Sequence, residues 1–179
     1  STPLYSSAAS DVYKRQVLMI RRANKEDIKY IMPIYEAAKK KMRADGNLHQ
    51  WSDKYPDEET LLNDITRNEL YIAYDDEGIY GVFMLSFSGE DTYKEIQGAW
   101  LNDEPYAVIH RIASLGNGKN LLKDAIDFTF EKTNNIRIDT HEDNNIMRTL
   151  LKKLGFIYTG IIHLKDGDER RAYQLIKSE

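Results

Sequence analysis

Apolar side chains recur along this chain at two different spacings, and the changes between them mark the expected elements. Residues 28–38 carry an apolar side chain every three or four positions, which is typical of a helix that buries one face. The same spacing returns at residues 57–67, 120–132 and 144–154, which predicts three further helices. Pro33 lies inside the first pattern and is expected to kink or divide that helix.

Short runs rich in β-branched and aromatic residues lie between these helices. They predict strands at residues 17–22, 70–74, 79–87, 106–113, 136–140, 156–164 and 170–176. Turns that contain Gly78 and Gly167 join two pairs of these strands into hairpins. The resulting order, β-α-α-β-β-β-α-β-α-β-β, predicts an α/β (α+β) fold in which helices flank a mixed sheet.

The first 18 residues differ from the rest of the chain. They are rich in serine and alanine, show no sustained period, and lack the basic start and apolar centre of a secretory signal. Met19 opens a segment that reads like a natural start. We therefore expect residues 1–18 to be a non-native-looking or disordered leader and residues 19–179 to form a single domain.

Composition narrows the classes of function. The chain has 179 residues, of which 41% are hydrophobic and 30% charged, a globular profile with no apolar run of membrane-spanning length. A net charge of -4 argues against binding to nucleic acid, which depends on clustered Lys and Arg. The absence of cysteine excludes disulfides and thiolate metal sites and fits a cytoplasmic location.

The segment with the clearest chemistry joins the strand at 106–113 to the helix at 120–132. The turn between them holds Gly116 and Gly118, so backbone N–H groups and the positive end of a helix dipole point at one place. Such a place suits an anion, most often a phosphate. Glycines are frequent in turns, however, and an ordinary strand-to-helix connection remains the alternative.

Three local sequences extend this observation, and together they resemble the GNAT family of N-acetyltransferases. Gly116 to Leu122 (GNGKNLL) is similar to the latter part of the acyl-CoA-binding loop of that family. Thr140 to Met147 (THEDNNIM) resembles the end of the fifth strand and the helix that follows it, and Leu154 to Phe156 (LGF) matches a further motif. The resemblance covers roughly residues 19–176.

The resemblance implies a fold and an activity. The fold is a central, mostly antiparallel, twisted sheet of six to seven strands with about four helices, splayed into a V between the fourth and fifth strands (106–113 and 136–140). The activity is acetyl-CoA-dependent transfer of an acetyl group to a primary amine within a ternary complex. The acceptor is a small-molecule amine or a protein N-terminus, and a homodimer is an open alternative because dimers are common in the family.

The same resemblance implies which residues hold acetyl-CoA. The cofactor-binding candidates are Ile112, Ala113, Ser114, Gly116, Asn117, Gly118, Lys119, Asn120, Asn144 and Met147. Strand backbone would pair with the pantetheine amides as a peptide pairs with a sheet edge, and the turn would hold the pyrophosphate. Asn144 has a second interpretation as a helix N-cap, and the two roles are compatible.

Two positions depart from the family pattern. Ala113 stands where the family has Arg or Gln, and the loop before Gly116 is shorter, so backbone groups are expected to make more of the pyrophosphate contacts. Leu151 stands where many relatives carry the tyrosine that protonates the leaving thiolate. These departures keep a second hypothesis open, namely a non-catalytic acyl-CoA-binding or sensing module.

The catalytic candidates are His110, Asn144 and Tyr158. Strand alternation predicts that His110 shares a face with Ile112, and its ordinary pKa near neutrality suits a general base, although a structural histidine is the alternative. Tyr158 is a candidate for the missing acid, with packing as its alternative. A backbone N–H near Ile112 or Ala113 is expected to stabilise the negative charge on the acetyl oxygen.

The acceptor site is expected to be formed by Trp51, Tyr55, Tyr106 and His110. Trp51 lies in a loop with acidic neighbours that would attract a cationic amine, and its alternative role is a hydrophobic plug beneath that loop. No metal is expected, because His141 and its acidic neighbours lack a second histidine at ligand spacing.

Overall fold

The computed structural model of the chain describes residues 19–116 and 119–179. The predicted leader and two predicted loop residues, Asn117 and Gly118, lie outside the described residues. The helices are α2 (Ile28–Ala44), α3 (Glu58–Thr66), α4 (Leu121–Phe130) and α5 (Asn145–Lys153), with 3-10 turns η1 (Lys25–Asp27) and η2 (Asp91–Tyr93). The strands are β1 (Met19–Arg22), β2 (Leu70–Asp75), β3 (Gly78–Ser86), β4 (Gln97–Gly98), β5 (Ala107–Ser114), β6 (Asn135–Thr140), β7 (Ile157–His163) and β8 (Glu169–Ile176).

Local signals fix where the helices begin and end. The Asp57 carboxylate accepts a hydrogen bond from the backbone N–H of Thr60 at the start of α3. The Asn120 and Asn144 side chains accept equivalent bonds at the starts of α4 and α5, so Asn144 is the N-cap of the last helix. Gly155 follows α5 with φ +94°, a left-handed conformation that costs glycine little.

All eight strands form one sheet in the order β1-β2-β3-β5-β6-β8-β7-β4. Neighbouring strands are antiparallel except for the central β5–β6 pair, which is parallel. The predicted mixed, mostly antiparallel sheet with four helices is therefore confirmed. The strand beyond the predicted seven is β4, a two-residue segment that contains Gly98.

The strand β4 could not be predicted from its sequence, because it contains Gly98 and glycine is typical of turns. Gly98 pairs with Gly160 of β7, and the two backbones approach so closely that a Cβ on Gly160 would overlap the carbonyl oxygen of Gln97. Only a residue without a side chain fits at this crossing. The strand is thus determined by a tertiary contact rather than by local propensity.

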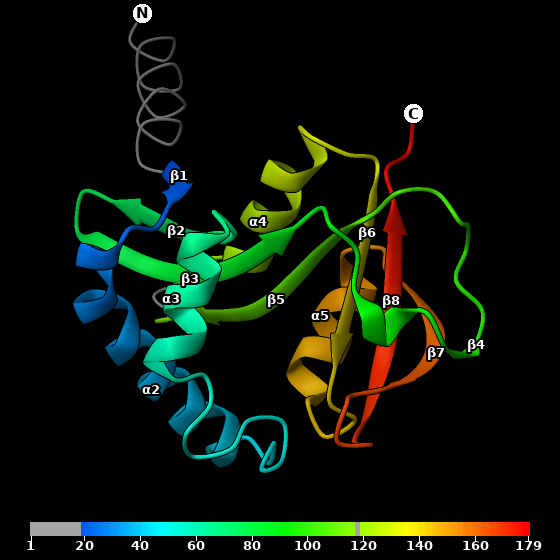
Figure 1. Cartoon of the computed structure of the whole chain (residues 1–179), viewed down its shortest axis with the longest axis horizontal. Helices are drawn as coiled ribbons and strands as arrows, with labels where there is room; N and C mark the ends of the chain where they lie inside the picture. The colour runs from blue at the N-terminus through cyan, green and yellow to red at the C-terminus, as the bar shows by residue number, and fades with distance from the viewer. Residues whose placement is uncertain (1–18, 117–118) are drawn as a thin grey trace, which may run out of the picture.

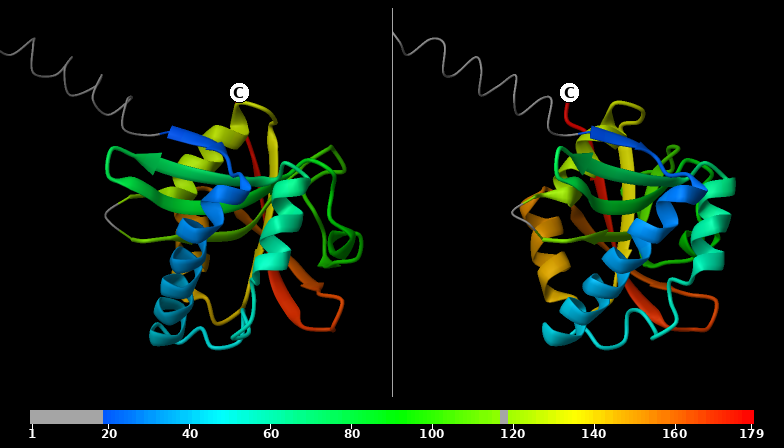
Figure 2. Two further views of the ribbon diagram at one scale, coloured as in Figure 1. Left: turned by 60° about the vertical axis from the view of Figure 1, so that its left-hand side comes forward. Right: turned by 90° about the vertical axis from the view of Figure 1, so that its left-hand side faces the viewer.

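The helices cover both faces of the sheet, as the views in Figures 1 and 2 show. Helices α2 and α3 pack on one face around Ile31, Tyr35 and Leu61. Helices α4 and α5 pack on the other face, where Ala125 and Leu151 are buried. Burial of these apolar side chains is the main force that holds the layers together.

Of the two outcomes expected at Pro33, a kink or a division, the structure excludes the division of α2. The helix runs from residue 28 to residue 44 without division, with Pro33 inside it. The missing N–H of Pro33 removes one helical hydrogen bond, but Ile31, Ile34 and Tyr35 on either side are buried against the sheet and hold the helix together. Among the described residues, no helix is both long enough and apolar enough to cross a membrane.

Candidate active site

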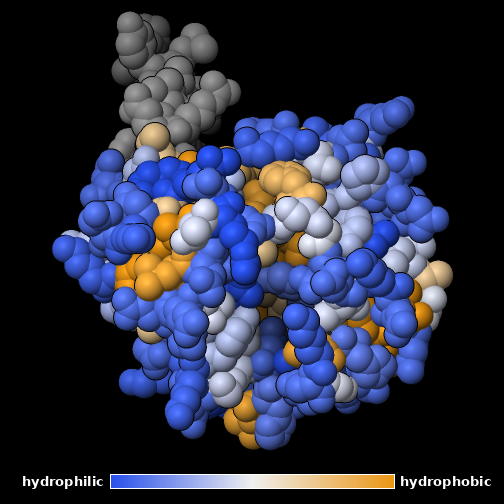
Figure 3. All heavy atoms as spheres, in the orientation of Figure 1, coloured by the Kyte–Doolittle hydropathy of each residue, from blue (hydrophilic) through white to orange (hydrophobic). Residues whose placement is uncertain are grey.

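The two central strands separate soon after they meet. Within the described strands, β5 pairs with β6 only through Ala107–Ile136 and Val108–Arg137. Beyond these pairs the strands diverge, as Figure 1 shows, and the predicted V-shaped splay is confirmed. A cavity of about 990 Å³ lies at this opening, and Figure 3 shows the face hollowed near its centre. One edge of β5 is thereby left without a strand partner along the cavity.

A β-bulge reshapes β5 at the point where it lines the cavity. Arg111 adopts φ +49°, and the pairing with β3 shifts between His110 and Ala113. The guanidinium of Arg111 binds both carboxylate oxygens of Asp64 at 2.9 and 2.6 Å. Its backbone carbonyl accepts a hydrogen bond from the Tyr35 hydroxyl at 2.6 Å. These contacts hold an unusual backbone conformation in place.

The bulge overturns the predicted alternation. Ile112 packs into the same core as Ile109, which lies on the α4–α5 side of the sheet. His110 instead has its ring against Tyr93, at 6.1 Å between centroids. His110 and Ile112 therefore do not share a face, because the extra residue at Arg111 inverts the alternation after it.

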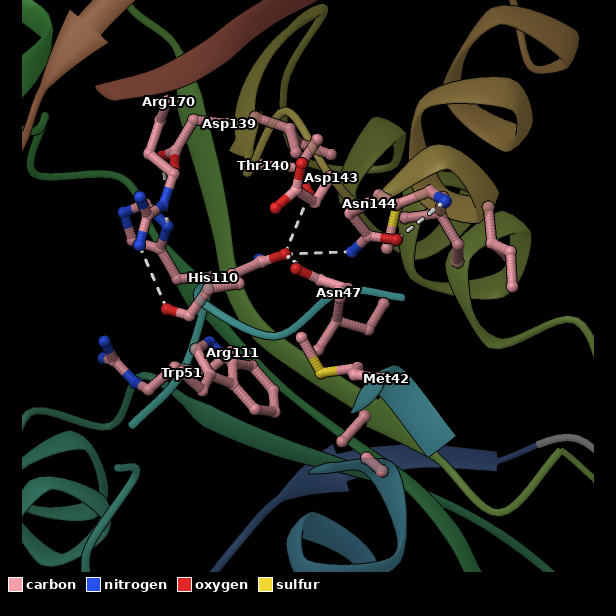
Figure 4. A pocket seen from close by; sticks show the side chains of 18 of the residues that line it. Met42, Asn47, Trp51, His110, Arg111, Asp139, Thr140, Asp143, Asn144 and Arg170 are labelled. Carbon is pink, nitrogen blue, oxygen red and sulfur yellow. Dashed lines mark hydrogen bonds and ion pairs between the residues drawn. The ribbon is translucent and has the colours of Figure 1, made fainter. Parts of the chain in front are cut away.

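His110 lies between two carboxylates, as the close view in Figure 4 shows in part. Its Nε2 is 3.2 Å from Oε2 of Glu90, and its Nδ1 is 3.7 Å from Oδ2 of Asp139. The imidazole lines the cavity and about a fifth of its side chain is exposed. A positive charge on this ring would therefore face a negative group at each nitrogen.

Both carboxylates are held by further hydrogen bonds. The hydrogen bond with His110 lowers the pKa of Glu90 to about 2, against the opposing effect of burial. The Thr92 hydroxyl donates to Glu90 at 2.9 Å, and the Tyr106 hydroxyl accepts from the Glu90 backbone N–H. Burial raises the pKa of Tyr93, so its phenol stays protonated and donates to Asp139 at 2.6 Å.

The loop between α2 and α3 reaches the far side of the cavity through Gln50. Its Oε1 accepts hydrogen bonds from Asn144 at 3.0 Å, from Thr140 at 3.2 Å and from Asn47 at 2.9 Å. The Asn144 side chain is thus engaged at both ends, because its Oδ1 caps α5 through the Met147 N–H at 3.1 Å. Gln50 joins the acceptor-side loop to the start of α5.

Most of the predicted site residues meet at this cavity. The predicted residues that line it are Trp51, Tyr55, His110, Ile112, Ala113, Ser114, Gly116, Lys119, Asn120, Asn144 and Met147. Lys119 also contacts Asp75 at 2.5 Å. Trp51 packs edge-on against Tyr35 and belongs to the α2–α3 core, so it both plugs the loop and faces the cavity.

Two predicted site residues lie elsewhere. Tyr158 is exposed on β7 with its ring against Tyr173, and it does not line the cavity. Tyr106 does not line the cavity either, and its hydroxyl accepts a hydrogen bond from the backbone N–H of Glu90. Direct roles for these two tyrosines remain predictions that their positions do not favour. Leu151, at the place of the family tyrosine, is fully buried.

Sequence reasoning gave no role in the site to three charged residues that line the cavity, Glu90, Asp139 and Arg170. Glu90 lies in a polar connector, and nothing in its local sequence connects it with His110. Gln50 belongs to the loop that was expected to cover the acceptor site, and Asp139 was considered only as an acidic neighbour of His141. No group of three or more His, Cys, Asp or Glu side chains that could hold a metal occurs among residues 19–116 and 119–179.

Comparison with known proteins defines the class. The model of the acetyltransferase (GNAT) family matches residues 31–156. A GNAT-family acetyltransferase from Streptococcus agalactiae is 31% identical, covers 90% of this chain and 96% of its own, and superposes with a TM-score of 0.81. The fold is thus that of an acyltransferase whose sheet opens at its centre. The chain belongs to the GNAT acetyltransferase family.

Two more distant structures share the fold. An acetyltransferase-like protein from Salmonella typhimurium, solved with its cofactor acetyl-CoA, is 18% identical over 91% of this chain and 95% of its own, with a TM-score of 0.57. The ribosomal-protein-S18-alanine N-acetyltransferase of Escherichia coli is 15% identical over 90% and 95%, with a TM-score of 0.58. A search of curated proteins finds no match.

Proposed function

We propose that this protein is an acetyl-CoA-dependent N-acetyltransferase that passes the acetyl group directly to a primary amine. The observation that carries the proposal is the cavity at the β5–β6 opening, where His110 lies between two carboxylates. Acetyl-CoA, when bound, would supply the acetyl group as a thioester: the amide C–N bond forms as the C–S bond breaks, and CoA leaves as a thiolate that takes up one proton. Because the chain has no cysteine, the thiol nucleophile of a two-step transfer is absent.

The cavity fits acetyl-CoA in size and in hydrogen-bonding groups. Its volume of about 990 Å³ is at the upper end of small-molecule sites. The unpaired edge of β5 offers main-chain donors and acceptors to the amides of a pantetheine arm. The start of α4, capped by Asn120, offers N–H groups to a phosphate. We assign to cofactor binding Ile112, Ala113, Ser114, Gly116, Asn117, Gly118, Lys119, Asn120 and Met147.

His110 is the proposed general base. It accepts the proton that the acceptor ammonium must lose, and the imidazolium is then stabilised by Glu90 at Nε2 and by Asp139 at Nδ1. A backbone N–H of Ile112 or Ala113, next to the bulge, donates to the acetyl oxygen as negative charge develops there. The Nδ2 of Asn144 already donates a hydrogen bond to Oε1 of Gln50. Asn144 can therefore donate to the cofactor only if this hydrogen bond breaks.

Two measurements test this function. Isothermal titration calorimetry with CoA should show binding at one site, and thiol release from acetyl-CoA should depend on added amine across a panel of small amines and peptides. Absence of CoA binding would refute both the activity and the assignment of the cavity.

A second candidate, an acyl-CoA-sensing module without turnover, is favoured by one observation. Leu151 is buried on α5 and brings no hydroxyl to the cavity, so the usual acid of the family has no replacement at that position. Tight CoA binding without acetyl transfer to any amine would select this candidate. Acetyl transfer with ordinary turnover would exclude it.

Two classes of acceptor are compatible with this cavity. The Escherichia coli relative acts on a ribosomal protein, as its name states, whereas the cavity here also has room for a small amine. Both a small-molecule amine and a protein N-terminus therefore stay as proposed acceptors. A cytoplasmic location, a homodimer and a single domain over residues 19–179 remain predictions.

A further inference from the structure

Arg170 is a buried cation in the cavity wall that has no carboxylate partner in the part of the chain that the structure describes. It lies near the start of β8 and only 5% of its surface is exposed. Its guanidinium donates to two backbone carbonyls, those of Gln50 at 3.0 Å and Glu169 at 2.9 Å. No carboxylate oxygen of residues 19–116 or 119–179 comes within 4.0 Å of it.

The other arginines near the cavity differ in this respect. Arg111 binds both oxygens of Asp64, and Arg171, the next residue along β8, pairs with Glu142 at 2.8 Å. Removing a guanidinium from water is costly unless a negative group lies against it. Two carbonyl dipoles compensate the charge of Arg170 only in part. The positive charge of Arg170, after burial itself, lowers the pKa of nearby His141.

We propose that Arg170 binds a carboxylate carried by the acetyl acceptor, so that the acceptor is an amino acid or another amine with a carboxylate. This inference rests on the proposed function, since it names the substrate class of the same cavity. Figure 4 shows Arg170 with Asp139 and His110 along one side of the pocket, across from Asn144. An anion-binding group and an amine-binding group thus share one wall.

The distribution of charge fits a zwitterion better than a polyamine. Glu90 and Asp139 beside His110 attract an ammonium group, whereas Arg170 repels a second one. A carboxylate against Arg170 forms the charge-assisted, two-pronged hydrogen bond for which a guanidinium is suited. Asp166 and Asp168 also line the cavity, but neither comes within ion-pair distance of Arg170.

Matched pairs of acceptors provide the test. Each pair differs by one carboxylate: lysine and cadaverine, ornithine and putrescine, tyrosine and tyramine, β-alanine and ethylamine. For the wild-type protein we expect kcat/KM to be about tenfold or more higher for the carboxylate member of at least one pair. In Arg170→Gln this preference should be largely lost, because the KM of the carboxylate member rises by about tenfold or more while the decarboxylated member is nearly unaffected.

Control variants separate binding from a purely structural role. Gln ends where Arg170 has Nε, so Arg170→Gln removes both the charge and the Nη2 contact with the Gln50 carbonyl. Loss of that contact alone would weaken both members of a pair, whereas loss of the charge weakens only the carboxylate member. Arg170→Lys restores a cation and should recover part of the preference. Arg171→Gln removes a neighbouring cation that does not line the cavity, and it should leave the preference unchanged.

Binding measured without turnover keeps the two proposals distinguishable. Ligand-observed NMR with CoA present compares the members of each pair in wild type and Arg170→Gln. Arg170-dependent binding of the carboxylate member supports this inference even if no acetyl transfer occurs, in which case only the proposed function fails. Three results would overturn the inference: equal binding of both members, an equal loss for both in Arg170→Gln, or loss of CoA affinity alone, which would mean that Arg170 serves a cofactor phosphate.

Discussion

His110 derives its proposed role from its neighbours rather than from its own position in the sequence. Its two nitrogens face Glu90 and Asp139 at 3.2 and 3.7 Å, and these carboxylates are fixed in turn by Thr92 and Tyr93. Histidine at this place could be predicted as a candidate, because it lies on the strand before the glycine turn. Its partners Glu90 and Asp139 could not be predicted, since Glu90 lies in the connector after β3 and Asp139 lies in β6.

Replacement of His110 by Ala tests the base. We expect kcat to fall by about a hundredfold or more, because general-base assistance typically contributes that much. The acidic limb of the pH–rate profile should disappear, since no imidazole then has to lose its proton before the reaction. His163→Ala, an exposed histidine outside the cavity, should behave like the wild type. An acidic limb that persists in His110→Ala would eliminate His110 as the base.

The lowered pKa of Glu90 has a consequence for stability. A carboxylate with an ordinary pKa of 4.5 that is held at about 2 in the folded protein contributes stability above pH 4.5. That stability is lost as the pH falls from about 4.5 to about 2. Glu90→Gln removes the titrating group, so urea unfolding of this variant should lose less stability than the wild type between pH 4.5 and pH 2.5. Parallel losses would contradict the His110–Glu90 contact.

At the level of elements, the bulge in β5 shows where sequence patterns stop being informative. The alternation of residues 106–113 predicted the strand itself, and helical spacing predicted all four helices. The strand alternation nevertheless assigned Ile112 to the wrong face. The left-handed backbone at Arg111 depends on Asp64, which lies 47 positions earlier in the chain. A pattern within one strand contains no trace of such a partner. The same holds for β4, which exists only through its contact with β7.

Asp64→Asn tests how strongly that partner holds the bulge. Asp64 is almost completely buried, and its replacement leaves the guanidinium of Arg111 buried without a counter-charge. We expect the free energy of unfolding to fall by about 3–5 kcal/mol. Asp53→Asn is the matched control, because Asp53 pairs with Arg43 at an exposed position and should cost no more than about 1 kcal/mol. Urea denaturation measures both, and similar losses would refute the structural role of Asp64.

Across the whole molecule, the sheet consists of two halves that meet at one short junction. β1, β2, β3 and β5 form one half, β6, β8, β7 and β4 form the other, and two residue pairs join them. The sequence predicts the order and type of the helices and strands, and it also predicts a ligand site at this opening. The chemistry of the acceptor side could not be predicted, because Gln50, Glu90 and Arg170 come from three separate segments that meet only after folding.

A ligand that fills the opening replaces the missing strand pairing, and hydrogen exchange can detect this. In the free protein, those backbone amides of residues 109–114 that point toward β6 have no partner strand, so they should exchange faster than amides between β2 and β3. Saturating CoA should slow their exchange by about tenfold or more relative to β2, since a bound pantetheine arm pairs with that edge. Amides of β2, remote from the cavity, serve as the internal control. Protection confined to α4, with β5 unchanged, would mean that CoA binds by its phosphates alone and that the thioester is not directed between the strands.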